Sequence, residues 1–411
     1  MSSVPKPYVV SSSKDDARHD VDRPMDFGIS TEQEALNRAA RRFAVERLKP
    51  LASTCDRNQS TPTDLYREAH ALGILSGTVP EAWGGAGVGP LSSALLAEIL
   101  GWACTGLQAT LFANHLSIVA LASAGTGKQK ERWLRRLALA PILASFCSTE
   151  AHGGSDPSGI RTRAIRDGSG FRLVGEKAWI TNATLASFYI ILATVDPDAG
   201  RDGLAAFVVD RAAPGVTVLP AESKLGHRAS DTACVRFDEV RLAADDMIAP
   251  PGQGFFLAMR VFDCTRPEVA AAATGLAQRC LDESLAVCEQ RHAFGRPIGE
   301  HQLVQSLLAD MVVGVETSRL AYQKAAFLVE RGERATKAAS VAKLHATHQA
   351  MKAALDAVQI HGAMGISTQL VVEKLLRDAK VMQIYEGTSE IQRLVIAREA
   401  RRDASKGPQL P

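Results

Sequence analysis

The spacing of apolar residues divides the chain into stretches with different hydrophobic periodicity. From Ser30 to about residue 141, apolar side chains such as Ala35, Ala39 and Phe43 recur every three or four positions. This period predicts a series of amphipathic helices. We expect the first of them to end at Pro50, because proline interrupts a helix.

Short β-type runs replace the helical spacing between residues 142 and 252. They are rich in branched and aromatic residues and are separated by turn-forming dipeptides, a pattern that predicts a small antiparallel sandwich or barrel. The predicted strands are residues 142–148, 171–174, 178–182, 188–195, 204–209, 216–219 and 233–237.

After Pro250-Pro251-Gly252 the helical period returns and continues to the end of the chain. Runs at 268–291, 302–331, 335–360 and 370–382 are long enough for a helical bundle. The pattern therefore predicts an α+β protein that is mainly α. Its expected parts are an N-terminal α-helical domain (26–141), a middle β domain (142–252) and a C-terminal four-helix bundle (253–405), flanked by a disordered N-terminal tail (1–25) and a short tail (406–411).

Composition changes this picture little. Hydrophobic residues make up 46% and charged residues 22% of the 411 residues, and the formal net charge is +2, so nothing recruits nucleic acid or a membrane surface. The N-terminus lacks the pattern of a signal or transit peptide, and no window is expected to span a bilayer. The seven cysteines are widely spaced and form no Cys-x-x-Cys, so we expect no disulfide framework, no metal site and a cytoplasmic location.

One stretch, residues 385–393, places a carboxylate directly before a helix start. Ser389 and Gln392 have the spacing of a capping box, which puts Glu386 at a bend of the chain. Gly387 leaves the neighbouring backbone open to a ligand. Local chemistry alone leaves two interpretations of Glu386, a solvated loop residue and a functional carboxylate.

Four further segments carry candidate chemistry, and each also has a plain structural interpretation. They are residues 146–156, 177–182, 262–267 and 291–302. Trp179 and Thr181 share one face of a predicted strand, where the Trp could equally belong to the core. Arg266, expected just before a helix that starts at Pro267, could hold a phosphate group or pair with Asp263. Residues 291–302 could be an ordinary loop between helices, and residues 146–156 could be an ordinary turn.

Taken together and in this order, these segments resemble the acyl-CoA dehydrogenase family, nearest its short- and medium-chain branch. The resemblance covers roughly residues 28–405 and includes Asp231-Thr232, Gln359-Ile360-His361-Gly362 and Arg377-Asp378-Ala379-Lys380. It implies an FAD-dependent enzyme that removes hydrogen from C2 and C3 of an acyl-CoA and gives the trans-2-enoyl product. Glu386 would take the C2 proton, and the C3 hydrogen would leave as hydride to flavin N5.

The resemblance also assigns the other site residues. The flavin contacts would be Thr149, Trp179 and Thr181. The adenine and pyrophosphate end of FAD would meet Arg291, Phe294, Gln302, Gln359, Gly362, Thr388 and Glu390. The acyl-CoA path would run along Ser155, Phe262, Asp263, Thr265, Arg266, Tyr385 and Gly387.

The implied partners are electron-transferring flavoprotein as electron acceptor and further copies of the chain, as a dimer of dimers that shares FAD between subunits. Two alternatives remain. The enzyme could be a dehydrogenase or an oxidase that acts on acyl thioesters bound to a carrier protein, or the chain could be a catalytically silent member that acts as a binding subunit.

Three positions depart from the family pattern. Ala151-His152 could reshape the loop over the flavin, and His152 could touch a ligand. Ala293 lacks a hydroxyl that could contact phosphate. Phe112 could shorten the acyl pocket or lie in the core.

Overall fold

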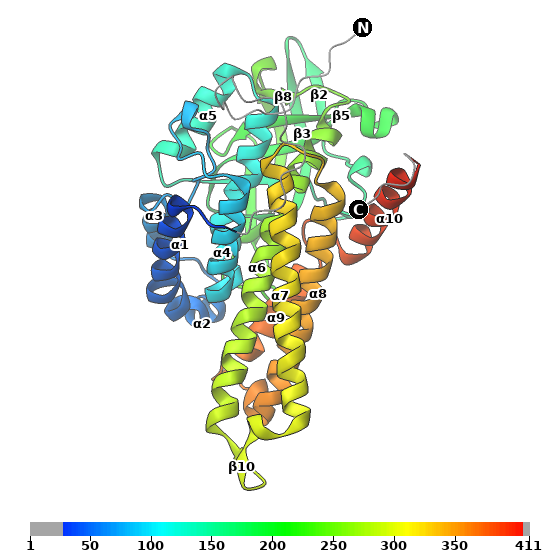
Figure 1. Cartoon of the computed structure of the whole chain (residues 1–411). Coiled ribbons are helices and arrows are strands. Elements are labelled where there is room, and N and C mark those ends of the chain that lie inside the picture. Colours follow the sequence, from blue (N-terminus) through cyan, green and yellow to red (C-terminus); the bar gives the residue numbers. More distant parts are fainter. Residues whose placement is uncertain (1–27, 406–411) are drawn as a thin grey trace.

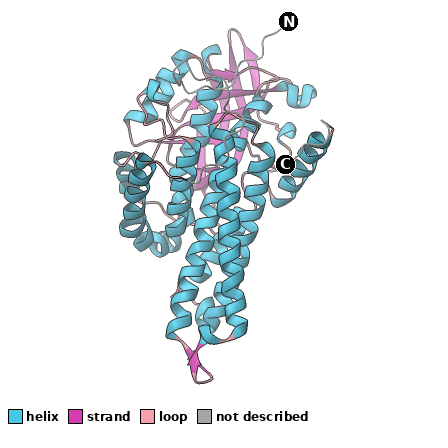
Figure 2. Ribbon diagram, viewed as in Figure 1, coloured by secondary structure: helices cyan, strands magenta, loops and turns pink. Residues whose placement is uncertain are grey.

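The computed structural model describes residues 28–405 and consists of a helical N-terminal part, a β-sheet and a bundle of long helices (Figures 1 and 2). The predicted α+β class with mainly helical content is confirmed. The two tails predicted from the sequence, residues 1–25 and 406–411, lie outside the described residues.

The N-terminal helices are α1 (Thr31–Phe43), α2 (Lys49–Asn58), α3 (Thr63–Ala71), α4 (Pro90–Ala124) and α5 (Gly127–Leu139). Ser30 caps α1, because its hydroxyl accepts the Gln33 N–H at 3.2 Å. The expected helix end at Pro50 is wrong. A π-helical turn (Ala44–Leu48) leads directly into α2, and Pro50 lies in the first turn of α2.

Helix α4 runs through the core and packs against α6 (Gly254–Gln290). A Cβ added at Gly101 would lie 2.6 Å from the carbonyl oxygen of Ala272, so glycine permits this close approach. Contrary to the sequence-based expectation, α4 is long and apolar enough to cross a membrane, but 78% of its most apolar window is buried inside the protein. Its hydrophobicity therefore serves the core.

The sheet has the strand order β6-β7-β3-β2-β4-β5-β8, and β1 pairs with β4. The strands are β1 (Leu143–Cys147), β2 (Arg163–Asp167), β3 (Gly170–Thr181), β4 (Ala186–Thr194), β5 (Leu204–Asp210), β6 (Val216–Ala221), β7 (Thr232–Leu242) and β8 (Met247–Ala249). Most pairs are antiparallel as expected, but β1 and β2 pair with β4 in parallel, so the sheet is mixed. The predicted strands 171–174 and 178–182 are one strand, β3.

The bundle contains α6, α7 (Gln302–Glu330), α8 (Thr336–His361) and α9 (Val372–Met382), and α10 (Ser389–Ala404) packs against α8. The predicted helix start at Pro267 is wrong, because Pro267 lies inside the 37-residue helix α6. A small hairpin, β9 (His292–Ala293) and β10 (Arg296–Pro297), joins α6 to α7 at the end of the bundle far from the sheet (Figure 1).

Short 3-10 turns connect the larger elements. They are η2 (Glu81–Trp83), η3 (Pro157–Gly159), η4 (Pro197–Gly203), η5 (Ala244–Asp246), η6 (Ile298–Glu300) and η7 (Gly362–Ile366).

Candidate active site

Glu386 lies at a sharp bend between α9 and α10. Its backbone φ of +54° is left-handed, a conformation that residues other than glycine rarely adopt. Gly387 follows with φ +95°. The helix cap is one residue earlier than expected, because the hydroxyl of Thr388, not Ser389, accepts the Ile391 N–H at 3.3 Å. The Glu386 N–H donates no hydrogen bond within residues 28–405.

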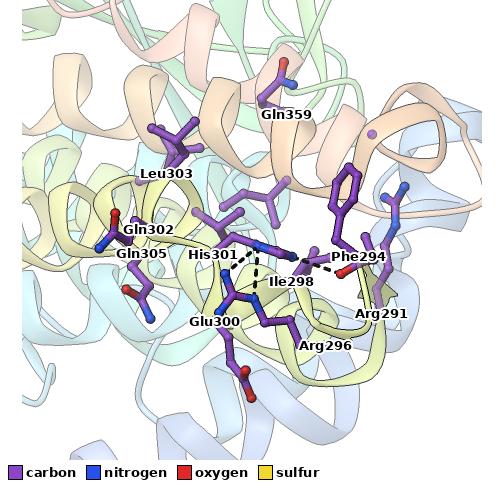
Figure 3. Close-up of a pocket in the computed structure, with 15 residues that line it drawn as sticks. Arg291, Phe294, Arg296, Ile298, Glu300, His301, Gln302, Leu303, Gln305 and Gln359 are labelled. Carbon is purple, nitrogen blue, oxygen red and sulfur yellow. Dashed lines mark hydrogen bonds between the residues drawn. The ribbon is translucent and has the colours of Figure 1, made fainter.

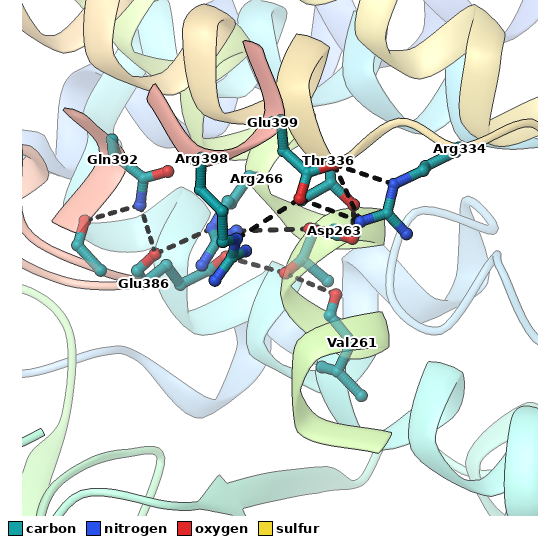
Figure 4. Close-up of polar contacts among 11 residues, drawn as sticks. Val261, Asp263, Arg266, Arg334, Thr336, Glu386, Gln392, Arg398 and Glu399 are labelled. Atoms are coloured by element: carbon teal, nitrogen blue, oxygen red, sulfur yellow. Dashed lines mark hydrogen bonds and ion pairs between the residues drawn. The ribbon is translucent and has the colours of Figure 1, made fainter. Parts of the chain in front are cut away.

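Side chains from α6 hold the bend from one side (Figure 4). The Thr265 hydroxyl donates to the Glu386 carboxylate at 2.7 Å, and Arg266 Nε donates to the Glu386 carbonyl oxygen at 3.1 Å. Arg266 also pairs with Asp263 at 3.3 Å, and Thr336 donates to Asp263 at 2.5 Å. The geometry therefore supports the interpretation that Arg266 pairs with Asp263. The Arg266 side chain is almost fully buried.

Burial raises the pKa of Glu386 to about 7, against the hydrogen bond from Thr265 and the positive charge of Arg266. The carboxylate therefore has the basicity of a general base near neutral pH, rather than that of a solvated loop residue. The side chain remains partly accessible, so a ligand can reach it.

Tyr385 and Phe262 border the same region. The Tyr385 ring lies 5.6 Å from the ring of His227, and the Phe262 ring lies 5.9 Å from that of Phe146, which belongs to β1. These contacts join the loop of Glu386 and the start of α6 to the β domain. The base therefore lies where the bundle meets the β domain, and such junctions commonly bind ligands.

Trp179 and Thr181 lie at the end of β3, where a register shift interrupts the pairing with β7. Trp179 has φ +60° and its side chain is 56% exposed, so the core interpretation is wrong for this residue. The backbone N–H of Ala178 donates to the Thr149 carbonyl oxygen at 3.0 Å, which brings Thr149 beside Trp179. An exposed indole and two hydroxyl side chains thus lie near the C-terminal end of β3.

A buried ion pair lies close to this end of β3. Lys177 is fully buried and donates to Glu150 at 2.8 Å, while Thr162 donates to the same carboxylate through its hydroxyl at 2.6 Å. Although burial opposes ionisation, the Lys177 ammonium and these donors hold the pKa of Glu150 at about 2. His152 lies in the exposed turn that carries Ser155, and its Nε2 is 3.0 Å from the Gly159 carbonyl oxygen, so it contacts its own loop.

A second site lies at the far end of the bundle, around the β9–β10 hairpin (Figure 3). It is a pocket of about 1030 Å³, and the five predicted cofactor residues that line it are Arg291, Phe294, Gln302, Gln359 and Gly362. A Cβ on Gly362, whose φ is +61°, would lie 3.0 Å from Arg291 Nη1. Phe294 is 96% exposed at its rim. Cationic and aromatic groups at this pocket suit a nucleotide.

The structure does not bring all predicted cofactor residues together within one chain. Thr388 and Glu390 lie within four positions of Glu386, which contacts Thr265 near the middle of α6. Arg291 lies 26 positions after Thr265, at the far end of α6. That separation corresponds to about 39 Å along a helix. One chain thus carries two halves of the predicted FAD site at opposite ends of its bundle.

Phe112 lies in the helical core and is only 9% exposed.

Sequence reasoning missed two polar groups near Glu386. Lys343 of α8 is fully buried and donates to the Gly387 carbonyl oxygen at 2.9 Å. His115 of α4 lies 2.6 Å from the buried carboxylate of Glu268, one helical turn beyond Thr265. Lys343 shares a helical stripe with small apolar residues, and a lysine on such a stripe is the signal that could have revealed it.

Three family models match the chain in order. The acyl-CoA dehydrogenase N-terminal domain matches residues 30–140, the middle domain residues 145–240 and the C-terminal domain residues 252–400. A probable medium-chain specific acyl-CoA dehydrogenase 2 from Caenorhabditis briggsae is 40% identical over 92% of this chain and 92% of its own length.

Two solved structures are similar over almost the whole chain. Butyryl-CoA dehydrogenase from Megasphaera elsdenii has a TM-score of 0.90 and 34% identity, and the match covers 92% of this chain and 100% of that one. The prolyl acyl carrier protein oxidase AnaB has a TM-score of 0.86 and 30% identity, with coverage of 91% and 100%.

Proposed function

The chain belongs to the acyl-CoA dehydrogenase family, and from this premise we propose that Glu386 is the base that removes the C2 proton of an acyl-CoA. The protein is a flavin-dependent oxidoreductase with FAD as cofactor. The single observation that carries the assignment of the base is the strained Glu386 bend, which combines a left-handed backbone with a carboxylate whose pKa burial raises to about 7.

The proton transfer needs two contributions from this chain. A C2 proton is far too weakly acidic for a solvated carboxylate, so Glu386 must be a stronger base than usual, and its partial burial provides this. Negative charge then develops on the thioester oxygen and needs a donor. The Glu386 N–H is oriented by the same bend and has no other acceptor within the described residues, so it can donate there.

The residues present suit FAD. The exposed Trp179 and the hydroxyls of Thr149 and Thr181 would contact the flavin, while Arg291 would meet the pyrophosphate and Phe294 the adenine end. Bound FAD would supply the acceptor for the C3 hydrogen as hydride, and the product would be a trans-2-enoyl-CoA. The chain contributes the walls that exclude water and hold the acyl group between Glu386 and the flavin.

The separation of the two half-sites supports a shared cofactor. The helical path of about 39 Å between Thr265 and Arg291 exceeds the reach of one dinucleotide, so one FAD cannot join both ends of a single chain. In a dimer, the bundle tip of one subunit would complete the flavin site of the other. A dimer of dimers, the assembly that we propose, would also cover exposed apolar residues such as Leu303 and Ile366.

We further propose electron-transferring flavoprotein as the electron acceptor and a reducing, cytoplasmic location. Support for the location comes from the seven cysteines, all of which are free thiols. The acceptor is tested by supplying purified electron-transferring flavoprotein, or oxygen alone, to enzyme reduced by substrate and following flavin reoxidation.

The experiment that tests the function is an anaerobic titration of the yellow holoenzyme with a panel of acyl-CoAs. Bleaching of the flavin band by at least one acyl-CoA, with the enoyl-CoA product, is the expected result. A second function, oxidation of a carrier-bound thioester, is favoured by the similarity to the prolyl acyl carrier protein oxidase. Bleaching by carrier-bound thioesters, and by none of the CoA esters, would replace the first function with the second.

A further inference from the structure

Lys343 of α8 is a buried cation with one hydrogen-bond partner among the described residues. Its side chain is 0% exposed, and its Nζ donates to the Gly387 carbonyl oxygen at 2.9 Å. Burial lowers the pKa of Lys343 to about 7, although the nearby Glu386 carboxylate opposes this shift. An ammonium without a carboxylate at contact distance is costly to bury, so a structural reason must offset that cost.

Two other side chains donate to the same bend. Arg266 Nε donates to the Glu386 carbonyl oxygen at 3.1 Å. Gln392 Nε2 donates to the carbonyl oxygens of Glu386 and Gly387 at 3.2 and 3.1 Å (Figure 4). The three donors come from α6, α8 and α10, so three helices fix the orientation of two consecutive peptide groups. That fixation holds Glu386 in its left-handed conformation, which a free chain would leave.

We propose that Lys343 is a positioning residue for Glu386, which holds the Gly387 carbonyl so that the carboxylate and N–H of Glu386 face the substrate, and whose charge keeps the base ionised. This inference rests on the proposed role of Glu386. It adds a residue of α8 that has no contact with the reacting atoms.

The charged groups around Glu386 decide the direction of the effect. From α6, Arg266 favours the ionised carboxylate and Glu268 opposes it, while Lys343 of α8 favours it. His115 of α4 also faces Glu386, and Glu390 of α10 faces Lys343. Loss of the Lys343 charge therefore leaves Glu386 with one cation fewer and raises its pKa. Since only the ionised carboxylate accepts the proton, the acid limb of the rate profile moves to higher pH.

The test compares the FAD-loaded enzyme with Lys343→Met, which removes both charge and donor, and Lys343→Gln, which keeps a donor. Lys352→Met is the matched control, because Lys352 lies on the same helix and is 47% exposed. Two rates are measured against pH. One is anaerobic flavin reduction by an acyl-CoA, and the other is exchange of the C2 hydrogen of that acyl-CoA with D2O, which reports proton removal without net oxidation.

Both Lys343 variants should shift the acid limb of both rates upward by about one pH unit. Lys343→Met should also lower the exchange rate on the alkaline plateau by about tenfold or more, and Lys343→Gln by less, since an orienting hydrogen bond is lost only in the first. Lys352→Met should match the wild type. If Lys343→Met does not fold, the shift in Lys343→Gln decides the question.

Folded, FAD-containing Lys343 variants with wild-type pH profiles would overturn the positioning role while leaving Glu386 as the base. A plateau loss with no shift of the acid limb would overturn the charge effect. Wild-type enzyme that neither exchanges C2 hydrogen nor bleaches with any acyl-CoA would instead refute the proposed function, and the role of Lys343 with it.

Discussion

The Thr265 hydroxyl lies 2.7 Å from the Glu386 carboxylate and 3.1 Å from the Val261 carbonyl oxygen. A single hydroxyl proton serves one acceptor at a time, and the shorter contact favours the charged carboxylate. When Glu386 takes up a proton, the Thr265 hydroxyl can turn back to its own helix without leaving a buried donor unpaired. This contact therefore stabilises the ionised, reactive form of Glu386.

Thr265→Val tests that contact with little change in side-chain volume. Loss of a hydrogen bond to the ionised form should raise the pKa of Glu386 and move the acid limb of kcat/KM upward by about one to two pH units. The pH profile of kcat/KM for acyl-CoA oxidation measures it. An unchanged acid limb would mean that Thr265 donates to Val261 in the working enzyme.

The wild-type pH profile follows from the raised pKa of Glu386, about 7. Proton removal needs the ionised carboxylate, so kcat/KM should be constant above this pKa and fall as the pH drops through it, approaching about tenfold per unit. Stopped-flow flavin reduction at limiting acyl-CoA, from pH 5 to 9, provides the profile. An acid limb near the ordinary glutamate value of 4.5 would contradict the burial effect.

Phe294→Ala tests the nucleotide pocket at the bundle tip. The ring is 96% exposed, so its removal should not lower the stability of the protein without FAD, yet it should weaken FAD binding by about tenfold through lost stacking. Fluorescence titration of the apoprotein with FAD measures the change. The control is Leu139→Ala, an exposed apolar side chain of α5 outside the pocket. Equal FAD affinity in Phe294→Ala and the control would remove Phe294 from the cofactor site.

The buried pair Lys177–Glu150 predicts a stability effect. Lys177→Met leaves the Glu150 carboxylate buried without its cation and should lower the free energy of unfolding by about 3–5 kcal/mol. The double variant Lys177→Met, Glu150→Gln removes both charges and should recover part of the loss. Denaturant unfolding of the three proteins measures this, and a double variant that is less stable than the single one would show that the pair acts through other contacts.

The helical spacing predicted most of the long helices because each buries one continuous apolar stripe. It failed where tertiary contacts override local preference. Pro267 predicts a helix start, because proline favours the first position of a helix. Helix α6 nevertheless continues through Pro267, because the flanking residues are buried against α4. Likewise the predicted strands 171–174 and 178–182 join into β3, since residues 175–177 also pair with β7.

The candidate site was predictable only in part. The order of the segments led to the family and to Glu386, and the exposed Trp179 agrees with a ligand-facing role. The donors that hold the bend could not be placed from the sequence. Gln392 reads as half of a capping box but turns back to the carbonyls of Glu386 and Gly387, and Lys343 lies 43 residues before Glu386 in the chain. Their role depends on how α8 and α10 pack.

The account depends most directly on Glu386, and the decisive measurement is anaerobic flavin reduction by an acyl-CoA in Glu386→Gln, with the exposed Glu316→Gln as control. The amide keeps the shape of the side chain but cannot accept the proton. Glu386→Gln should retain FAD and bind acyl-CoA, while the rate of flavin bleaching falls by about 100- to 10,000-fold and the control bleaches normally. Bleaching of Glu386→Gln at the wild-type rate would contradict the assignment of Glu386 as the base.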